Sequence, residues 1–147
     1  MRITTLYEKD FYAWTREQAN LIETKSLNKL DLIHLQQELQ IMGASEKREL
    51  ASRLEVLLMD LLKWKYQPDL KCNSWKYTIE EQRDQLKYHL EDNPSLGSPE
   101  YLDVIFKRAF NSATRDAAKE TGLSKSFFPE TCEWTFAQIL DNEFYPN

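Results

Sequence analysis

Residues 45–68 form the longest stretch of the chain with one consistent period, and the stretch becomes more apolar toward its end. Its main stripe recurs at spacings of three and four, which is the signature of one face of a helix. This stripe consists of Leu50, Leu54, Leu57, Leu58 and Leu61. In the second half apolar side chains surround most of the helix, and such a helix is usually buried. The pattern predicts a central helix over about residues 45–66, ended by Pro68.

Two further helices are predicted before the central one. A capping box of Thr5 with Glu8 starts the first, which extends to about residue 22. The second covers about residues 28–42 and is expected to end at Gly43, because glycine commonly occupies the left-handed position after a helix. This short connection at Gly43 predicts that the second helix and the central helix are antiparallel neighbours.

Three more helical segments are predicted after the central helix. One begins near residue 73 or as late as residue 78 and ends before Asn93 and Pro94. The next begins at Ser98 and Pro99, a cap followed by proline at the first helical position, and ends at Gly122. A short last helix begins at Thr135, and the aromatic residues around it are expected to pack an otherwise irregular segment.

Length and composition agree with this helical pattern. A chain of 147 residues is the size of one ordinary domain, and 3 Gly and 5 Pro leave little material for sandwiches or barrels. We therefore predict an all-α fold, a helical bundle of about five main helices around the helix at about 45–66, with an irregular aromatic C-terminal segment. Residues 1–147 are expected to form a single domain.

Charge and cysteine content bound the class of protein. A net charge of −5 argues against a surface that is entirely a polyanion-binding face. Cys72 and Cys132 are 60 positions apart with no second Cys or His near either, so neither a zinc pattern nor a disulfide framework is expected. No signal peptide or membrane span is expected, because the first residues lack an apolar core and no run reaches 18 apolar residues. We expect a cytoplasmic protein.

Several phrases of the sequence together resemble one known family. They are LYEKDFYAWTREQANLI, LDLIHLQQELQIMGASEKRELASRLEVLLMDLLKWKYQP, SWKYTIEEQR, NPSL, ETGL and FPETCEWTFAQIL. Over essentially the whole chain they resemble the bacterial domain-of-unknown-function family 29. The resemblance implies an all-helical bundle and no established activity.

The chain departs from this family pattern at two places. Members resembling it often have Glu-Glu where Gln37 and Glu38 stand here, and His where Asp60 stands. A histidine beside carboxylates is a set of metal ligands, so these departures weigh against transferring such a site from the family to this chain.

The residues themselves still offer one possible metal site. His34 and Glu38 are four apart and lie one above the other on a helix, and Asp60 faces them if the two neighbouring helices are antiparallel. A divalent metal ion could bind such a set in a metal-dependent enzyme. The alternative is that His34 and Glu38 form a solvated pair and that Asp60 meets Lys63 or Arg53.

A second candidate surface lies in residues 61–77, where lysines alternate with aromatic residues and Asp69 is the one acid. Cations that contact phosphate and rings that stack on bases are what single-stranded nucleic-acid binding requires. The candidate residues are Lys63, Lys65, Lys71, Lys76, Trp75 and Tyr77. The alternative is that the rings are buried and the lysines belong to a helix end and a solvated loop.

No glycine-rich phosphate loop, dinucleotide fingerprint or nucleophile elbow occurs in the sequence. Neither Cys72, Cys132 nor His89 has a neighbour in the sequence that would make it a catalytic group. We therefore expect a small non-catalytic interaction module without a cofactor, whose partner is a protein. Nucleic-acid binding and metal-dependent catalysis are the two alternatives, and the sequence leaves the oligomeric state open.

Overall fold

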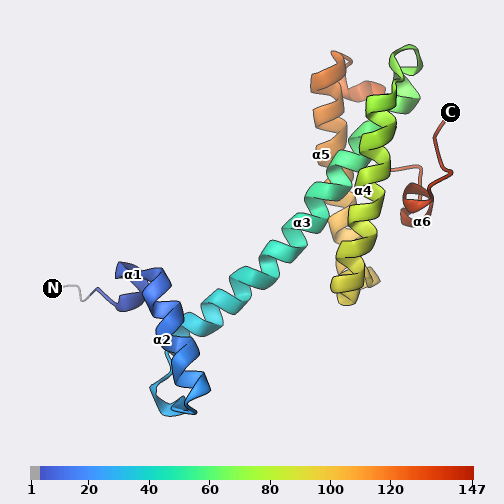
Figure 1. Ribbon diagram of the computed structural model, residues 1–147. Helices are drawn as coiled ribbons and strands as arrows, with labels where there is room; N and C mark the ends of the chain where they lie inside the picture. The colour runs from blue at the N-terminus through green and yellow to red at the C-terminus, as the bar shows by residue number, and fades with distance from the viewer. Residues whose placement is uncertain (1–3) are drawn as a thin grey trace. The chain divides into compact units, whose positions relative to one another are not determined.

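The computed structural model describes residues 4–147, and every regular element in that range is a helix (Figure 1). The predicted all-α class is therefore confirmed. The chain divides between Ala44 and Ser45 into two compact units, here called the N-terminal unit and the C-terminal unit. The expectation that residues 1–147 act as a single domain stays a prediction.

The N-terminal unit begins with two short helices where one was predicted. Thr5 caps α1 (Leu6–Lys9) as expected, its hydroxyl accepting a hydrogen bond from the Glu8 backbone. The helix then stops at Asp10, whose carboxylate accepts from the backbone of Ala13 and caps α2 (Phe11–Glu23). The prediction of one continuous first helix was wrong because Asp10 competes for backbone donors and restarts the helix.

A turn joins α2 to the third helix. It contains Lys25 at φ 58° and the 3-10 turn η1 (Leu27–Lys29). Asp31 then lies at the start of α3, where its side chain accepts a hydrogen bond from the backbone of His34. This bond satisfies one of the backbone donors that a helix leaves unpaired at its N-terminus.

Helix α3 (Leu32–Tyr66) contains 35 residues and continues through Gly43 without a break. The predicted helix end at Gly43 was therefore wrong. Glycine costs only about 1 kcal/mol relative to alanine inside a helix, and helix propagation past one such residue continues when both flanking segments are strong formers. Met42, Gly43, Ala44 and Ser45 belong to the helix and do not form a turn between antiparallel helices.

The helices predicted after α3 are confirmed. After the 3-10 turn η2 (Pro68–Leu70), α4 spans Asn73–Asp92 and ends before Pro94. The turn η3 (Pro94–Gly97) leads to α5 (Pro99–Thr121). Gly122 follows α5 at φ 74°, the left-handed conformation that glycine adopts without steric cost.

The last segment contains η4 (Lys125–Phe127) and α6 (Phe136–Leu140). The predicted capping box is present in α6, where Thr135 and Gln138 bond to one another's backbone. The rest of the segment is irregular and aromatic as expected: Phe128 belongs to the core of the C-terminal unit, and Trp134 and Tyr145 pack against that core.

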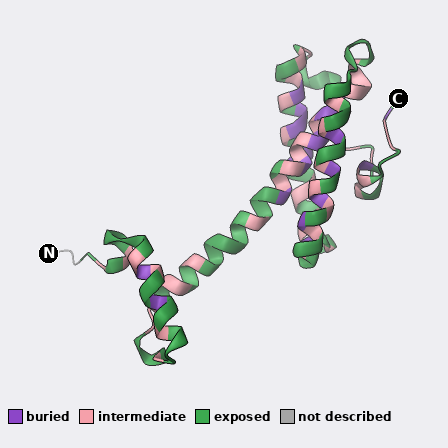
Figure 2. Ribbon diagram, in the orientation of Figure 1, coloured by how far each residue is buried: buried purple, intermediate pink, exposed green. Residues whose placement is uncertain are grey.

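The core of the C-terminal unit lies where α3, α4 and α5 pack side by side (Figure 2). Helix α3 contributes the most leucines, and its buried stripe is the predicted one with Leu62 added. The buried apolar residues of α3 in this core are Leu50, Leu54, Leu57, Leu58, Leu61 and Leu62. Among the described residues, none of the helices combines the length and the apolar character needed to cross a lipid bilayer.

Candidate functional site

A groove runs along the N-terminal unit between α2 and the first part of α3. Its volume is about 490 Å³ and its wall is almost entirely apolar. The side chains that line it are Phe11, Trp14, Thr15, Gln18, Ala19, Ile22, Leu35, Glu38, Leu39 and Met42. On both helices these positions recur at spacings of three and four, so each helix presents one continuous stripe to the groove.

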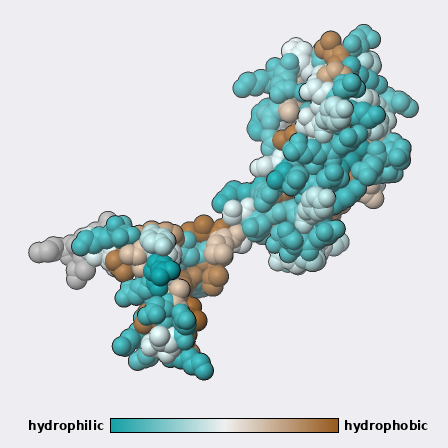
Figure 3. Space-filling model, in the orientation of Figure 1, coloured by the Kyte–Doolittle hydropathy of each residue, from teal (hydrophilic) through white to brown (hydrophobic). Residues whose placement is uncertain are grey.

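The N-terminal unit that contains this groove exposes many large apolar side chains. Among residues 4–147, ten of the fifteen exposed large hydrophobic residues belong to the N-terminal unit. They are Leu6, Phe11, Tyr12, Ile22, Leu27, Leu32, Ile33, Leu39, Ile41 and Met42. In Figure 3 brown side chains gather on this unit, whereas the visible face of the C-terminal unit is mostly teal. Large contiguous patches of exposed apolar surface are typical of interaction sites.

A polar and aromatic cluster supports one end of the groove, and we call it the Tyr7 cluster. Its five members are Tyr7, Trp14, Asp31, His34 and Glu38. The Tyr7 ring stacks on His34 with 4.0 Å between centroids, and its hydroxyl donates to Glu38. Oδ2 of Asp31 accepts from Trp14 Nε1 at 3.0 Å and lies 2.7 Å from His34 Nδ1. These bonds tie Tyr7 of α1 and Trp14 of α2 to residues at the start of α3.

Electrostatics in the Tyr7 cluster follow from these bonds. The hydrogen bond to Glu38 raises the pKa of the Tyr7 hydroxyl, because ionised Tyr7 would face a second negative charge. Burial on its own would raise the pKa of Asp31, but hydrogen bonds from His34 and Trp14 lower this pKa below its ordinary value. Asp31 is therefore held as an anion at the start of α3, where the helix dipole favours negative charge.

The three residues predicted as metal ligands are distributed over both units. His34 and Glu38 belong to the Tyr7 cluster, where Tyr7 contacts both of them. Asp60 belongs to the C-terminal unit, where it is only 4% exposed and lies 3.4 Å from Lys63 Nζ. Burial raises the pKa of Asp60 although the Lys63 ammonium opposes this shift. Metal binding by these three residues stays a prediction.

The predicted nucleic-acid surface is partly neutralised by carboxylates. Lys63 Nζ lies 2.9 Å from Glu120, and Lys65 Nζ lies 3.1 Å from Glu133. Phosphate would have to displace both acidic partners before it could contact these two lysines.

The remaining candidates of this surface lie in or after the loop between α3 and α4. Lys71 is exposed, and its ammonium lies over the Trp64 ring at 4.9 Å. Lys76 and Tyr77 are exposed on the first turns of α4, and Trp75 is half-buried beneath Lys63. Nucleic-acid binding by this segment stays a prediction.

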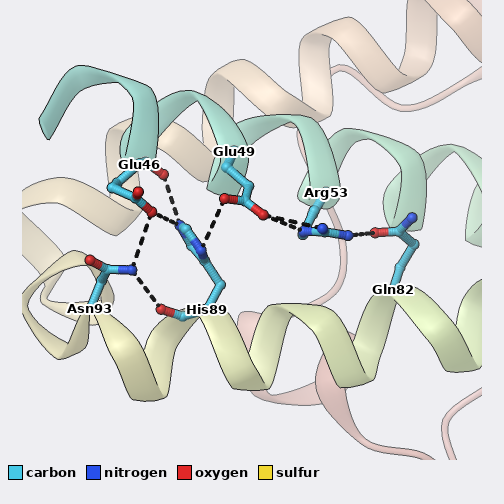
Figure 4. Close-up of polar contacts among 6 residues, drawn as sticks. All are labelled: Glu46, Glu49, Arg53, Gln82, His89 and Asn93. Atoms are coloured by element: carbon cyan, nitrogen blue, oxygen red, sulfur yellow. Dashed lines mark hydrogen bonds and ion pairs between the residues drawn. The ribbon is translucent and has the colours of Figure 1, made fainter. Parts of the chain in front are cut away.

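A separate polar cluster in the C-terminal unit connects α3, at Glu46 and Glu49, to the last turns of α4, at His89 (Figure 4). His89 on α4 is only 7% exposed, and its Nε2 lies 2.9 Å from the backbone oxygen of Glu46. Its Nδ1 lies 3.4 Å from Oε2 of Glu49, and its Nε2 lies 3.6 Å from Oε2 of Glu46. We call Glu46, Glu49 and His89 the His89 cluster. One ligand atom from each residue lies within 4.8 Å of the other two.

Further side chains hold the carboxylates of the His89 cluster in place. Arg53 donates from Nε to Oε1 of Glu49 at 3.1 Å, which leaves Oε2 directed at His89. Nδ2 of Asn93 lies 3.5 Å from Oε2 of Glu46 and donates to the backbone oxygen of His89 at 3.1 Å. Gln82 contacts Arg53 from α4 at 3.5 Å. Residues from both helices therefore orient the cluster.

Sequence reasoning missed the His89 cluster for a definite reason. A helix end at Gly43 would place Glu46 and Glu49 in the first turn of a new helix, where their charges complement its dipole without any other partner. In the sequence His89 is an isolated histidine on a charged helix. A signal was available, because two glutamates three positions apart lie on one helix face and His89 lies three positions after the buried Leu86.

Comparison with known proteins identifies the family of the chain. Neither curated proteins nor solved structures give a match. One family, described as Domain of unknown function DUF29, matches residues 6–145. The match covers nearly all of the 147 residues, including α1, both parts of α3 and the aromatic C-terminal segment. The chain therefore belongs to the DUF29 family.

Proposed function

We propose that this chain is a non-catalytic interaction module that binds an amphipathic helix of a partner protein in the groove of the N-terminal unit. One observation carries the proposal: an apolar groove of about 490 Å³ lies open between α2 and α3. We place the module in the cytoplasm, since its two cysteines are unpaired and a reducing compartment fits that state.

The N-terminal unit has little core of its own. Of residues 4–44, only Trp14 and Gln18 are buried. Segments of about 40 residues seldom bury enough apolar surface to be stable without a further stabilising element. Phe11, Leu39 and Met42 are between about half and two-thirds exposed, although each of these side chains gains free energy on leaving water. A bound partner would supply the missing burial.

The dimensions of the groove suit a helix. Its stripe on α2 extends over 11 residue steps and its stripe on α3 over 7, which correspond to about 16 Å and about 10 Å of helix. Two helices that present parallel stripes form two sides of a three-helix arrangement, and the third side is open. A partner helix of about 11 residues with apolar anchors at spacings of three and four fits this space.

The groove also indicates the charge of its partner. Glu38 is the one ionisable residue in its wall. A partner helix with Lys or Arg beside its apolar stripe would place a cation near the Glu38 carboxylate, and such complementarity favours correct orientation. The partner we propose is therefore an amphipathic helix with a basic flank.

The concave shape argues against a second copy of the chain as the occupant. In a two-fold symmetric dimer the same surface contacts itself, so a groove would face a groove. That arrangement leaves a void, and a void costs about 24 cal/mol for each Å³ that remains empty. A convex ridge from another protein fills the groove without this cost.

Photo-crosslinking in the native cell tests the proposal. A photoreactive phenylalanine replaces Ala19, which is exposed in the wall of the groove. The matched control carries the same group at Asn20, which is exposed on α2 outside the groove wall. We expect the Ala19 position to capture a distinct protein through an amphipathic helical segment, which mass spectrometry of the crosslinked peptide would identify.

A synthetic peptide of that segment completes the test. It should bind the purified full chain, and Leu39→Asp should abolish binding because it puts a charge into the apolar wall. Crosslinks from Ala19 only to a second copy of the chain, only to a segment without an apolar helical stripe, or no more than from Asn20 would contradict the proposal.

A further inference from the structure

We propose that Glu46, Glu49 and His89 bind one divalent transition-metal ion, of which Zn²⁺ is the best fit, and that this ion ties α3 to α4. Within residues 4–147 they are the one group of three or more potential ligand residues whose donor atoms lie this close together. The site is independent of the groove in the N-terminal unit.

The hydrogen bonding of His89 is the first argument. Nε2 lies 2.9 Å from the backbone oxygen of Glu46, and a carbonyl oxygen only accepts, so Nε2 carries the proton. In neutral imidazole Nδ1 then has a lone pair, and it faces Oε2 of Glu49 at 3.4 Å. Two atoms with lone pairs at this distance repel, and either a metal ion between them or a proton on Nδ1 removes the repulsion.

The distances are those of ligands around a small metal ion. Zn²⁺ binds nitrogen and oxygen at about 2.0–2.2 Å, which places tetrahedral ligand atoms about 3.3–3.6 Å apart. The separation of 3.4 Å between Nδ1 of His89 and Oε2 of Glu49 falls in this range. Oε2 of Glu46 lies 3.6 Å from the other ring nitrogen, Nε2, so this half-exposed side chain has to turn toward Nδ1 to complete a three-ligand set.

The surroundings supply the support that metal ligands need. A ligating histidine usually donates its other ring nitrogen to a carbonyl or carboxylate, which fixes its tautomer and orientation. His89 does so through the backbone of Glu46. Arg53 engages only Oε1 of Glu49, and Asn93 contacts Oε2 of Glu46. The His89 ring is thus fixed and buried, while the two carboxylates stay accessible to an ion arriving from solvent.

The donor set also selects the class of ion. One imidazole nitrogen and two carboxylate oxygens suit Zn²⁺ and, with lower affinity, Mn²⁺. Ca²⁺ prefers six to eight oxygen ligands, which this cluster does not offer. The contrary reading is a protonated His89 that pairs with both glutamates and binds no ion.

Calorimetric titration of the full chain with ZnCl₂ and with MnCl₂ distinguishes these readings. Cys72→Ser is introduced first, because this exposed thiol could bind zinc by itself. We expect one Zn²⁺ per chain, weaker Mn²⁺ binding and a higher Tm in the presence of zinc. His89→Gln should weaken zinc binding at least about 100-fold, more than the 10–100-fold expected from losing a supporting partner.

The chain supplies its own matched control. Glu81 is an exposed glutamate on α4 outside the His89 cluster, so Glu81→Gln should leave the zinc affinity unchanged. Co²⁺ gives a second readout, since its absorption bands report the ligands directly and should disappear in Glu49→Gln. If His89→Gln does not fold, Glu46→Gln and Glu49→Gln decide, because both side chains are about half exposed.

Two results would overturn the proposal. One is the absence of zinc binding at micromolar concentrations in the folded Cys72→Ser chain. The other is binding of equal strength in His89→Gln, Glu46→Gln and Glu49→Gln, which would assign the ion to other residues.

Discussion

The Nε atom of Arg83 lies 2.7 Å from the backbone oxygen of Ile139, and the Arg83 side chain is completely buried. The same guanidinium donates to the backbone oxygens of Phe144 at 2.5 Å and Asn142 at 3.5 Å. The ring of Tyr145 lies 5.2 Å from its central carbon. Burial lowers the pKa of Arg83, yet arginine keeps its charge at any ordinary pH. One side chain on α4 therefore fastens the irregular C-terminal segment.

Removing this guanidinium should cost more stability than any surface change. Arg83→Ala is expected to lower the free energy of unfolding by at least about 3 kcal/mol, because several carbonyls lose their donor and each buried unsatisfied group costs about 1–3 kcal/mol. Arg83→Lys should recover little, since an ammonium lacks the planar fork of donors. Urea denaturation measures both effects.

Lys87 provides a control for this prediction, because it also lies on α4 and contacts the C-terminal segment. Lys87 donates to the side chain of Asn142 at 3.2 Å on the exposed surface, and Lys87→Ala should change the free energy of unfolding by no more than about 0.5 kcal/mol. A loss below about 1 kcal/mol in Arg83→Ala would show that the C-terminal segment does not depend on Arg83.

Replacing leucines of α3 with alanine should cost much more stability in its buried second part than in its exposed first part. Leu58 and Leu61 are completely buried, and replacing either with Ala should cost about 2–5 kcal/mol. Leu39 is 66% exposed, so Leu39→Ala should cost far less in the purified chain without a partner. Urea midpoints of the three variants test this contrast. An equal loss of unfolding free energy in Leu39→Ala and Leu58→Ala would contradict an open groove at Leu39.

Two carboxyl groups make the stability of the C-terminal unit depend on pH. A hydrogen bond to Asp116, burial and the repulsion of that second carboxylate raise the pKa of Glu55 to about 7. Between about pH 4.5 and pH 7 the folded chain therefore holds a proton that the unfolded chain has released. Stability from this pair is present at low pH and is lost as the pH rises through 7.

Asp116→Asn should remove this dependence. We expect the variant to melt at a higher temperature than the parent at pH 8 and to show a smaller fall in Tm between pH 5 and pH 8. Asp103→Asn, an exposed position on the same helix, should leave the pH profile unchanged. Melting curves at several pH values provide the measurement, and parallel profiles for parent and Asp116→Asn would contradict the shared proton.

Alanine substitutions at Gly43 and Gly122 should change the stability of the chain in opposite directions. Gly43 is helical, and an added Cβ would meet no atom within 4 Å, so Gly43→Ala should raise the free energy of unfolding by about 0.5–1 kcal/mol. Gly122 also has open space around it, but its φ of 74° strains any residue with a Cβ. Gly122→Ala should therefore destabilise the chain by about 1 kcal/mol. Two changes of the same sign in thermal melts would be inconsistent with a continuous α3.

Gly43 also shows how far the sequence predicts the fold. The periodicity of Leu50, Leu54 and Leu57 identified the buried face of α3, because that face is set by spacing alone. Whether a helix ends at a glycine depends on a small free-energy difference. Glycine costs about 1 kcal/mol of helix propensity, and this cost competes with the free energy gained by continuing the helix. A stripe is therefore more predictable than a boundary, and the two helices expected around Gly43 are one.

Polar residues in the core are the part that pattern analysis does not resolve. Arg83 lies four positions after Ile79 and three before Leu86, so its place on the buried stripe of α4 is visible in the sequence. Its partners are backbone oxygens more than 50 positions away, which no side-chain pattern encodes. His89 is a similar case, because its contacts with Glu46 and Glu49 depend on the packing of α4 against α3.

The position of Trp14 gives the chain a built-in optical reporter. Trp14 lines the groove and donates its indole proton to Asp31, whereas Trp64, Trp75 and Trp134 belong to the C-terminal unit. A variant with phenylalanine at those three positions would emit only from the groove wall. Its fluorescence spectrum would then follow the hydration of that wall directly, without an attached dye.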